Sequence, residues 1–293
     1  MVSEYVFHRL TNKCGLGCDH CVYSCVPSGY VPSIEDLQVV LSHLPKTMEV
    51  YIISGGEPIE SEELLFGALE YVQKNRESSM PNLKEIRVFT NGIWLTDETR
   101  FFDLVEELNH YDVNSIGISF DKFHVRAAEK KFPEIRPLSR QLIASMKEKL
   151  LQKYNGQIEL QTIGEFNYYP SPLGRAANLP SCEQARHNNC GLPKRPYLES
   201  TIISPQGSVY LCGLEISSSS LGSAIAEPMD NLIERATKNI VLNTLATKGP
   251  REVARITGTD ISEHYGSFGA SFEEDCRACK KIFLELAGIK YNI

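Results

Sequence analysis

Three cysteines near the start of the chain, Cys14, Cys18 and Cys21, are the residues whose types and spacing best predict chemistry. They form a C-x3-C-x2-C pattern. Thiolates are the usual protein ligands of iron–sulfur clusters, and a [4Fe–4S] cluster takes four ligands. Because this loop supplies three, one iron would be open to a ligand that does not come from the protein. Gly15 and Gly17 suit a loop that turns sharply around a small object, since glycine adopts positive φ at little cost.

The remaining composition indicates metal or redox chemistry rather than disulfide bonding. The N-terminus lacks the basic and apolar regions of a signal peptide, and no apolar run approaches the ~18 residues of a membrane-spanning helix. We therefore predict a cytoplasmic protein, in which nine cysteines point to metal or redox sites. A net charge of -7 argues against a nucleic-acid-binding surface as the main function. The other six cysteines are Cys25, Cys182, Cys190, Cys212, Cys276 and Cys279.

Strand and helix patterns alternate along the first half of the chain, which predicts a parallel sheet with right-handed crossovers. Five or six such units are too few for a closed eight-stranded barrel, so we predict an α/β fold with an open, partial (β/α)6 barrel. Active sites in such folds lie at the carboxyl ends of the strands. The cysteine loop and several polar segments follow those ends. The predicted strands cover 4–10, 48–53, 83–90, 114–120 and 157–162, and the polar segments are 54–57, 91–92, 119–121 and 164–165.

Several local features refine this prediction. Thr96 is expected to cap a helix that has acidic residues in its first turn, and an irregular stretch is expected between Asp121 and the helix predicted at 137–154. After about residue 180 the pattern changes, with a β-hairpin predicted at 201–211 and helical segments around 229–247. We therefore predict two domains, a core at 1–185 and a small C-terminal subdomain of hairpin and helix at 186–293.

The cysteine loop after the first predicted strand, together with the Gly-Gly-Glu-Pro segment at 55–58 after the second, resembles the radical S-adenosylmethionine (SAM) superfamily over most of residues 4–180. The resemblance implies that the amino and carboxylate groups of SAM bind the open iron. It also implies that a reductant such as flavodoxin or ferredoxin drives cleavage of SAM, and that the resulting 5′-deoxyadenosyl radical abstracts a hydrogen atom from the substrate. A zinc loop completed by Cys276 and Cys279 is the alternative.

The same resemblance implies a set of SAM-binding residues at the strand ends. The glycines at 55 and 56 would contact the methionyl amino group, and Arg175 would pair bidentately with the SAM carboxylate. Ordinary roles stay open: loop capping for Asn91, Ser119 and Asp121, a structural ion pair for Arg175, and a surface position for His20. The full set is His20, Ser54, Gly55, Gly56, Glu57, Asn91, Ser119, Asp121 and Arg175.

The cysteines of the C-terminal part resemble the ligands of a "twitch" subdomain, a hairpin-and-helix unit that holds one auxiliary [4Fe–4S] cluster. Four thiolates would complete that cluster, so it could not bind SAM and would relay electrons or tune the site. A structural zinc site with the same four cysteines is the alternative. The four residues are Cys190, Cys212, Cys276 and Cys279.

Cys25 and Cys182 are left over. A thiol beside a substrate radical could donate a hydrogen atom, whereas a small buried hydrophobic role is the plainer alternative for each. Segments 18–25, 90–94 and 118–124 resemble peptide-modifying radical SAM enzymes of the epimerase type. Gly213 departs from that group, in which a hydrogen-donating cysteine follows the auxiliary-cluster cysteine directly. Either Cys25 or Cys182 replaces it, or the outcome is oxidation or crosslinking.

Three functions therefore remain in view. The first is hydrogen abstraction from a ribosomally made peptide, although the 13 residues before Cys14 predict no leader-peptide-binding domain in front of the core. The second is oxidation of a small alcohol or an amino-sugar-like metabolite, by analogy with short twitch enzymes that resemble cyclitol dehydrogenases. The third is a non-catalytic iron–sulfur or zinc scaffold, for which reduced protein would release no 5′-deoxyadenosine from SAM.

Overall fold

A computed structural model describes residues 3–134, 138–163, 174–179, 200–211, 215, 217–262 and 272–288. One eight-stranded sheet organises these residues, in the order β5-β4-β3-β2-β1-β6-β7-β8. The first six strands pair in parallel, and β7 and β8 continue the sheet in antiparallel fashion. The strands are β1 (Tyr5–Arg9), β2 (Val50–Ser54), β3 (Glu85–Thr90), β4 (Ser115–Ser119), β5 (Glu159–Ile163), β6 (Ser200–Ile203), β7 (Ser208–Tyr210) and β8 (Ser220–Ser223).

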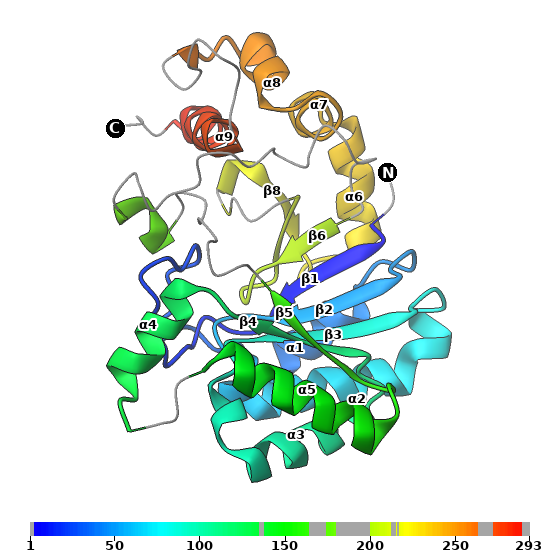
Figure 1. The fold of residues 1–293 in the computed structure, drawn as a ribbon. Coiled ribbons are helices and arrows are strands. Elements are labelled where there is room, and N and C mark those ends of the chain that lie inside the picture. Colours follow the sequence, from blue (N-terminus) through cyan, green and yellow to red (C-terminus); the bar gives the residue numbers. More distant parts are fainter. Residues whose placement is uncertain are drawn as a thin grey trace.

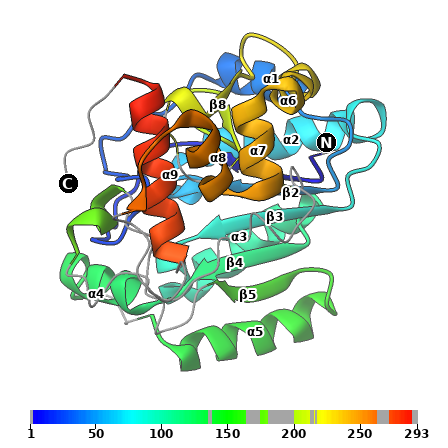
Figure 2. The ribbon, with the colours of Figure 1, turned by 90° about the horizontal axis from the view of Figure 1, so that it is seen from above.

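Helices connect the parallel strands, as the alternating pattern predicted. In Figure 1, α2, α3 and α5 lie together on one side of the strands, and α6 to α9 gather around the end of the sheet formed by β6 to β8. Figure 2 shows from above that α6 to α9 lie together. The helices are α1 (Ile34–Ser42), α2 (Glu62–Ser79), α3 (Glu98–His110), α4 (Lys122–Lys131), α5 (Arg140–Tyr154), α6 (Met229–Lys238), α7 (Ile240–Lys248), α8 (Pro250–Thr257) and α9 (Phe272–Leu286).

Amphipathic spacing explains why these helices form and which face they bury. In α1 the side chains of Leu37, Val40 and Leu41 are buried, at the helical spacing that places them on one face. Ser33 caps this helix, since its side chain accepts a hydrogen bond from the backbone N–H of Asp36. None of the helices in the described ranges is long and apolar enough to cross a membrane.

Two local predictions were wrong. The helix expected to begin at Thr96 is capped by Asp97, whose carboxylate accepts from the N–H of Arg100, because a 3-10 turn at Ile93–Thr96 occupies the preceding residues. The stretch after Asp121 contains α4 instead of irregular structure. This helix buries few apolar side chains, Phe123 and Ala128 among them, so its helical periodicity is weak in the sequence.

The C-terminal hairpin extends the core sheet. β6 pairs in parallel with β1, so the sixth parallel strand lies beside the first strand and not beside β5. The turn at 204–207 joins β6 to β7, where the sequence predicted it. β8 pairs with β7 in antiparallel fashion, and the register of this pairing shifts between Val209 and Tyr210 of β7. The predicted domain boundary near residue 185 lies outside the described residues.

A buried histidine makes the stability of this fold sensitive to acid. The Nδ1 atom of His8 lies 2.7 Å from the Tyr51 hydroxyl in the core, and burial lowers the pKa of His8 to about 3 from 6.5. Between these two pH values the unfolded chain takes up a proton that the folded chain does not. The free energy of unfolding should therefore fall as pH drops from 6.5 towards 3, and His8 should contribute up to about 1.4 kcal/mol per pH unit.

Urea unfolding at several pH values between 7.5 and 4 would measure this contribution. His8→Gln should give a shallower dependence of the free energy of unfolding on pH than the unmodified chain. His110→Gln is the matched control, because His110 is exposed at the end of α3, and it should keep the original dependence. An unchanged slope in His8→Gln would mean that His8 is protonated in the folded state.

Candidate active site

The cysteine loop follows β1, at the carboxyl end of the parallel strands. Cys14, Cys18 and Cys25 are buried, and together with Leu16 and Ala128 of α4 they form a small cluster separate from the main core. Cys21 packs against the same cluster. The three cysteines of the C-x3-C-x2-C pattern are thus gathered at one place. No disulfide joins these four cysteines.

Glu60 holds the start of this loop. Both oxygens of its carboxylate accept from the backbone N–H of Gly15, at 2.8 and 2.9 Å, and its carbonyl accepts from the Lys13 ammonium at 2.9 Å. A Cβ atom on Gly15 would lie 2.8 Å from the Glu60 carboxylate, so a side chain at this position would displace the carboxylate from its present place. Gly17 has φ +67, which fits the predicted sharp turn. Glu60 was not among the predicted residues, because its link to position 15 spans 45 residues.

The buried thiols oppose one another's ionisation. Burial raises the pKa of Cys14 to about 11, and burial together with Cys14 and Cys21 raises the pKa of Cys18, while Arg175 acts in the opposite direction. Metal ligation requires thiolates. A bound metal cluster carries positive charge on its irons, which offsets the repulsion between neighbouring thiolates. Three converging thiols, of which those of Cys14 and Cys18 are buried and that of Cys21 is partly buried, therefore fit the donor set of an iron–sulfur cluster.

The Gly-Gly-Glu segment pairs with the chain that leads into the cysteine loop. The N–H of Gly56 donates to the Thr11 carbonyl at 2.6 Å, and that of Glu57 donates to the Lys13 carbonyl at 2.8 Å. A Cβ atom would lie 2.1 Å from the Lys13 oxygen on Gly56 and 2.8 Å from the Thr11 oxygen on Gly55. Side chains at either position would push the two backbones apart, so these glycines allow the close approach of this segment to residues 11–13.

Glu57 links the ends of β2 and β3. Its carboxylate accepts from the Thr90 hydroxyl and the Asn91 N–H, each at 2.7 Å, and from the Ile59 N–H at 3.2 Å. Trp94 donates to the same Thr90 hydroxyl at 2.8 Å. Burial raises the pKa of Glu57 to about 7. The structure thus engages both carboxylate oxygens of this predicted SAM contact with donors from the protein.

Three further predicted residues stand at neighbouring strand ends. Ser54 ends β2, and its carbonyl accepts from the Leu10 N–H at 2.9 Å. Asn91 follows β3, and its side-chain oxygen accepts from the Ile93 N–H at 3.0 Å. Ser119 ends β4 and is partly exposed. The topology therefore brings these residues to the same edge of the sheet as the cysteine loop.

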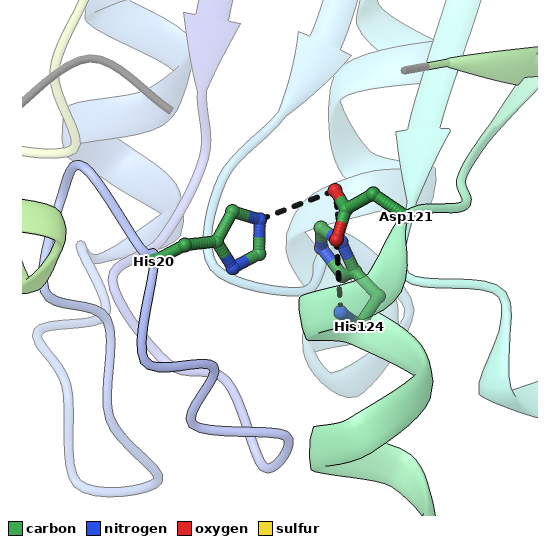
Figure 3. Close-up of side chains that lie close together, drawn as sticks. All are labelled: His20, Asp121 and His124. Carbon is green, nitrogen blue, oxygen red and sulfur yellow. Dashed lines mark hydrogen bonds and ion pairs between the residues drawn. The ribbon is translucent and has the colours of Figure 1, made fainter. Parts of the chain in front are cut away.

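Asp121, two residues after β4, lies between two histidines (Figure 3). Its Oδ2 atom lies 2.8 Å from Nδ1 of His124 and 3.3 Å from Nε2 of His20. Its Oδ1 atom caps α4 by accepting from the N–H groups of Phe123 and His124. The His20 ring stacks on Phe123 with centroids 4.7 Å apart. The cysteine loop is thereby attached to the start of α4, and His124, which was not predicted, completes the group.

The electrostatics of this group keep the carboxylate charged. Burial opposes ionisation of Asp121, but the hydrogen bonds from His124 and His20 outweigh it and lower the pKa of the carboxyl. One ligand atom from each residue lies within 4.8 Å of the others. Two imidazoles and a carboxylate could also ligate a divalent metal ion.

Two arginines contact the cysteine loop. The side chain of Arg175 donates to the carbonyls of Cys18 and Cys25, at 2.9 and 2.8 Å. Arg9, at the end of β1, is almost fully buried and pairs with Glu215. The Arg9 guanidinium also lies 3.6 Å from the centre of the Tyr23 ring. Arg9 and Glu215 were not predicted, since 206 residues separate them in the sequence.

Comparison with known proteins agrees with this geometry. The model of the family described as "Radical SAM superfamily" matches residues 9–159, which is just over half of the 293 residues. The chain belongs to the radical SAM superfamily. Its partial-barrel core is therefore a radical SAM core, and the family uses SAM and a [4Fe–4S] cluster.

Individual radical SAM relatives match at low identity. Over 127 residues the chain is 24% identical to the "Putative peptide biosynthesis protein YydG" of Bacillus subtilis (strain 168). The aligned residues make up 42% of this chain and 38% of that protein. The match thus spans well under half of the relative. BtrN in complex with AdoMet and 2-DOIA has a TM-score of 0.55 at 13% identity, covering 86% of this chain and 90% of that one. Native anSMEcpe with bound AdoMet and Cp18Cys peptide gives 0.47 at 15% identity, with 97% and 96% covered. The similarity to BtrN shows a common fold.

The remaining predicted cysteines are placed in part. Cys279 is buried on α9, and Cys276 lies one turn earlier on the same helix. Helix α9 packs against α8 and the short turn at Ser217–Ser219. Cys182, Cys190 and Cys212 lie outside the described residues, so their proximity to α9 stays a prediction.

Asp121→Asn tests whether the carboxylate is needed between the two histidines of this radical SAM core. The amide could still cap α4, but its NH2 group would face His20 and His124 and leave buried polar atoms poorly paired. We expect a loss of about 1–3 kcal/mol in the free energy of unfolding, measured by urea unfolding of the apo chain. Asp97→Asn is the control, since Asp97 is an exposed cap with the same backbone role, and asparagine caps equally well. Equal effects would show that the histidines do not depend on the Asp121 charge.

Proposed function

We propose that this chain is a radical SAM enzyme that abstracts a hydrogen atom from a ribosomally made peptide. The observation that carries the proposal is the set of Cys14, Cys18 and Cys21, two of them buried and Cys21 partly buried, held at the strand ends by the Gly-Gly-Glu segment and Glu60. The similarity to a protein named for peptide biosynthesis supports a peptide as the substrate.

In this proposal Cys14, Cys18 and Cys21 hold the SAM-binding [4Fe–4S] cluster and leave one iron for the amino and carboxylate groups of SAM. When bound and reduced, the cluster supplies the electron that cleaves SAM to methionine and a 5′-deoxyadenosyl radical. The protein contributes placement and the exclusion of water. A protein such as flavodoxin or ferredoxin would supply the reducing electron.

The residues at the strand ends divide into two proposed groups. Glu57 and Glu60 hold the loops in place through the hydrogen bonds described above. Contact with SAM itself is proposed for His20, Ser54, Gly55, Gly56, Asn91, Ser119 and Asp121, which the fold brings to this edge of the sheet. Asp121 would present a carboxylate that two imidazoles and a helix N-terminus hold in its charged form.

The C-terminal part, residues 186–293, is proposed to be a twitch-type subdomain with one auxiliary [4Fe–4S] cluster. Cys190, Cys212, Cys276 and Cys279 would be its ligands. The burial of Cys279 on α9 is compatible with ligation. Four thiolates would fill every ligand position of this cluster, so it could not bind SAM. Its role would be to transfer electrons or to tune the potential and shape of the active site.

Cys25 and Cys182 are proposed as hydrogen-atom donors to the substrate radical. A hydrogen bond with Cys21 and burial both raise the pKa of Cys25, so its thiol keeps the S–H bond that such a donor needs. Donation from a thiol would return hydrogen to the substrate and give epimerisation. Loss of a second electron would instead give an oxidised or crosslinked product.

Anaerobic reconstitution with iron and sulfide, followed by incubation with SAM, reductant and candidate peptides in D2O, tests the proposal. Release of 5′-deoxyadenosine with a change in peptide mass would support it. Uptake of one deuterium would indicate epimerisation, and loss of two hydrogens would indicate oxidation or crosslinking. Turnover of small alcohols but not peptides would favour the metabolite dehydrogenase instead. Iron uptake without 5′-deoxyadenosine would favour a scaffold.

The iron content tests the auxiliary cluster separately. About eight irons per chain would fit two [4Fe–4S] clusters, and about four would fit one. Cys276→Ala should lower the content towards four if that residue is a ligand. A content near four that Cys276→Ala leaves unchanged would rule out the auxiliary cluster.

A further inference from the structure

One arginine from late in the core reaches back to the cysteine loop through three hydrogen bonds. Arg175 stands on a 3-10 turn at Gly174–Asn178. Its backbone N–H donates to the Cys21 carbonyl at 3.0 Å. Its Nε donates to the Cys18 carbonyl at 2.9 Å and its Nη1 to the Cys25 carbonyl at 2.8 Å. A single residue therefore binds the loop at three points between positions 18 and 25.

These carbonyls belong to a segment without regular secondary structure. Inside the loop the N–H of Cys21 donates to the Cys18 carbonyl and that of Ser24 to the Cys21 carbonyl, both at 3.2 Å. Ser24 has φ 55, a left-handed conformation that is unfavourable for a residue other than glycine. Such a conformation persists when surrounding contacts hold it, and the three bonds from Arg175 supply contacts of that kind.

The geometry distinguishes this role from binding of the SAM carboxylate. A bidentate pair uses two neighbouring nitrogens of the guanidinium, but Nε and Nη1 of Arg175 already donate to loop carbonyls. Nη2 is buried and has no hydrogen-bond partner in the described part of the chain. Two side-chain nitrogens are thus committed to the loop, and one could serve an acceptor that a ligand brings.

We propose that Arg175 is a positioning residue that closes the cysteine loop around its cluster and raises the cluster's reduction potential through its fixed positive charge. This inference rests on the proposed function. The guanidinium is bonded to the backbone of the ligand Cys18, so its charge lies beside the ligand set. Reduction makes the cluster more negative, and a nearby cation stabilises the reduced form.

Two variants separate the loop contacts from the charge. Arg175→Gln removes the charge and most of the fork of donors, whereas Arg175→Lys keeps the charge but replaces the planar fork with one ammonium. Arg140→Gln is the matched control, because Arg140 is exposed at the start of α5. Each reconstituted protein would be followed by the rate of iron loss to a chelator, by the affinity for SAM, and by redox titration of the EPR signal that changes on adding SAM.

Both Arg175 variants should lose iron several-fold faster than the unmodified chain. Arg175→Gln should also show about a tenfold lower ratio of reduced to oxidised cluster at a fixed potential, which corresponds to about 59 mV for one electron. Arg175→Lys should keep the original potential, and Arg140→Gln should match the unmodified protein throughout. Arg175→Gln could fail to fold. In that case, an Arg175→Lys protein that loses iron no faster than the unmodified chain would still refute the proposed role of the loop contacts in holding the cluster.

Other outcomes would overturn the inference in distinct ways. Unchanged iron retention and potential with weakened SAM binding would assign Arg175 to the SAM carboxylate. Faster iron loss with an unchanged potential in Arg175→Gln would exclude the effect of charge. An unmodified chain that takes up no cluster would overturn the proposed function and this inference together, whereas an unmodified chain that cleaves SAM while both variants match it would overturn the inference alone.

Discussion

Replacing Cys18 with alanine should abolish the release of 5′-deoxyadenosine from SAM and lower the iron content by about four per chain. Cys18 is the central member of the buried thiol set, packed with Cys14 and Cys25. Two remaining thiols would leave the proposed cluster with half of its four ligands. Mutating a residue that only hydrogen-bonds to a metal ligand typically lowers activity roughly 10–100-fold. We expect a larger loss here, because Cys18 is itself a proposed ligand. Chromatographic quantification of 5′-deoxyadenosine and iron analysis would measure both effects.

Cys25→Ala is the matched control for this experiment, because it removes another buried thiol from the same cluster of side chains. We expect it to keep the iron and the cleavage of SAM. If Cys25 donates the hydrogen atom, this variant should lose deuterium incorporation into the peptide while still consuming SAM. A Cys18→Ala protein that retains its iron and its 5′-deoxyadenosine would refute the assignment of Cys18 as a ligand.

The sequence carries enough information to predict the location of this site. The thiol spacing and the strand–helix alternation are local patterns, and the carboxyl ends of parallel strands meet at one edge whatever the details of packing. Even the glycines at 55 and 56 could be predicted to allow a close approach. Which backbone approaches them could not be, because residues 11–13 reach them only through the pairing of β1 with β2.

The supporting residues were missed for a related reason. Glu60 and His124 carry no motif of their own, and each acquires a role from the loop or carboxylate that folding brings to it. Arg175 was predicted from a resemblance as a ligand of SAM, and that role stays a prediction. Its hydrogen bonds to Cys18 and Cys25 were not predicted, because they depend on a turn packed against the loop. Contacts of this kind are set by tertiary structure and leave no periodic signal in the sequence.

The second large effect is expected at the buried ion pair between Arg9 and Glu215. The Arg9 side chain is 1% exposed and that of Glu215 is 22% exposed. Arg9→Met would leave the Glu215 carboxylate partly buried without its cation, and would also remove the contacts of Arg9 with Asn12 and the Tyr23 ring. Removing one partner of a buried pair costs about 3–5 kcal/mol, so urea unfolding of the apo chain should show a loss of that size.

A double-mutant cycle would isolate the pair itself. Glu215→Leu combined with Arg9→Met should recover much of the loss, because paired removal leaves no uncompensated charge. Arg100→Met is the matched control: Arg100 also forms an ion pair with a glutamate, Glu62, at 3.0 Å, but both side chains are more than half exposed, so we expect a loss within about 1 kcal/mol. If Arg9→Met cost no more than Arg100→Met, the Arg9–Glu215 pair would contribute no more to stability than an exposed ion pair.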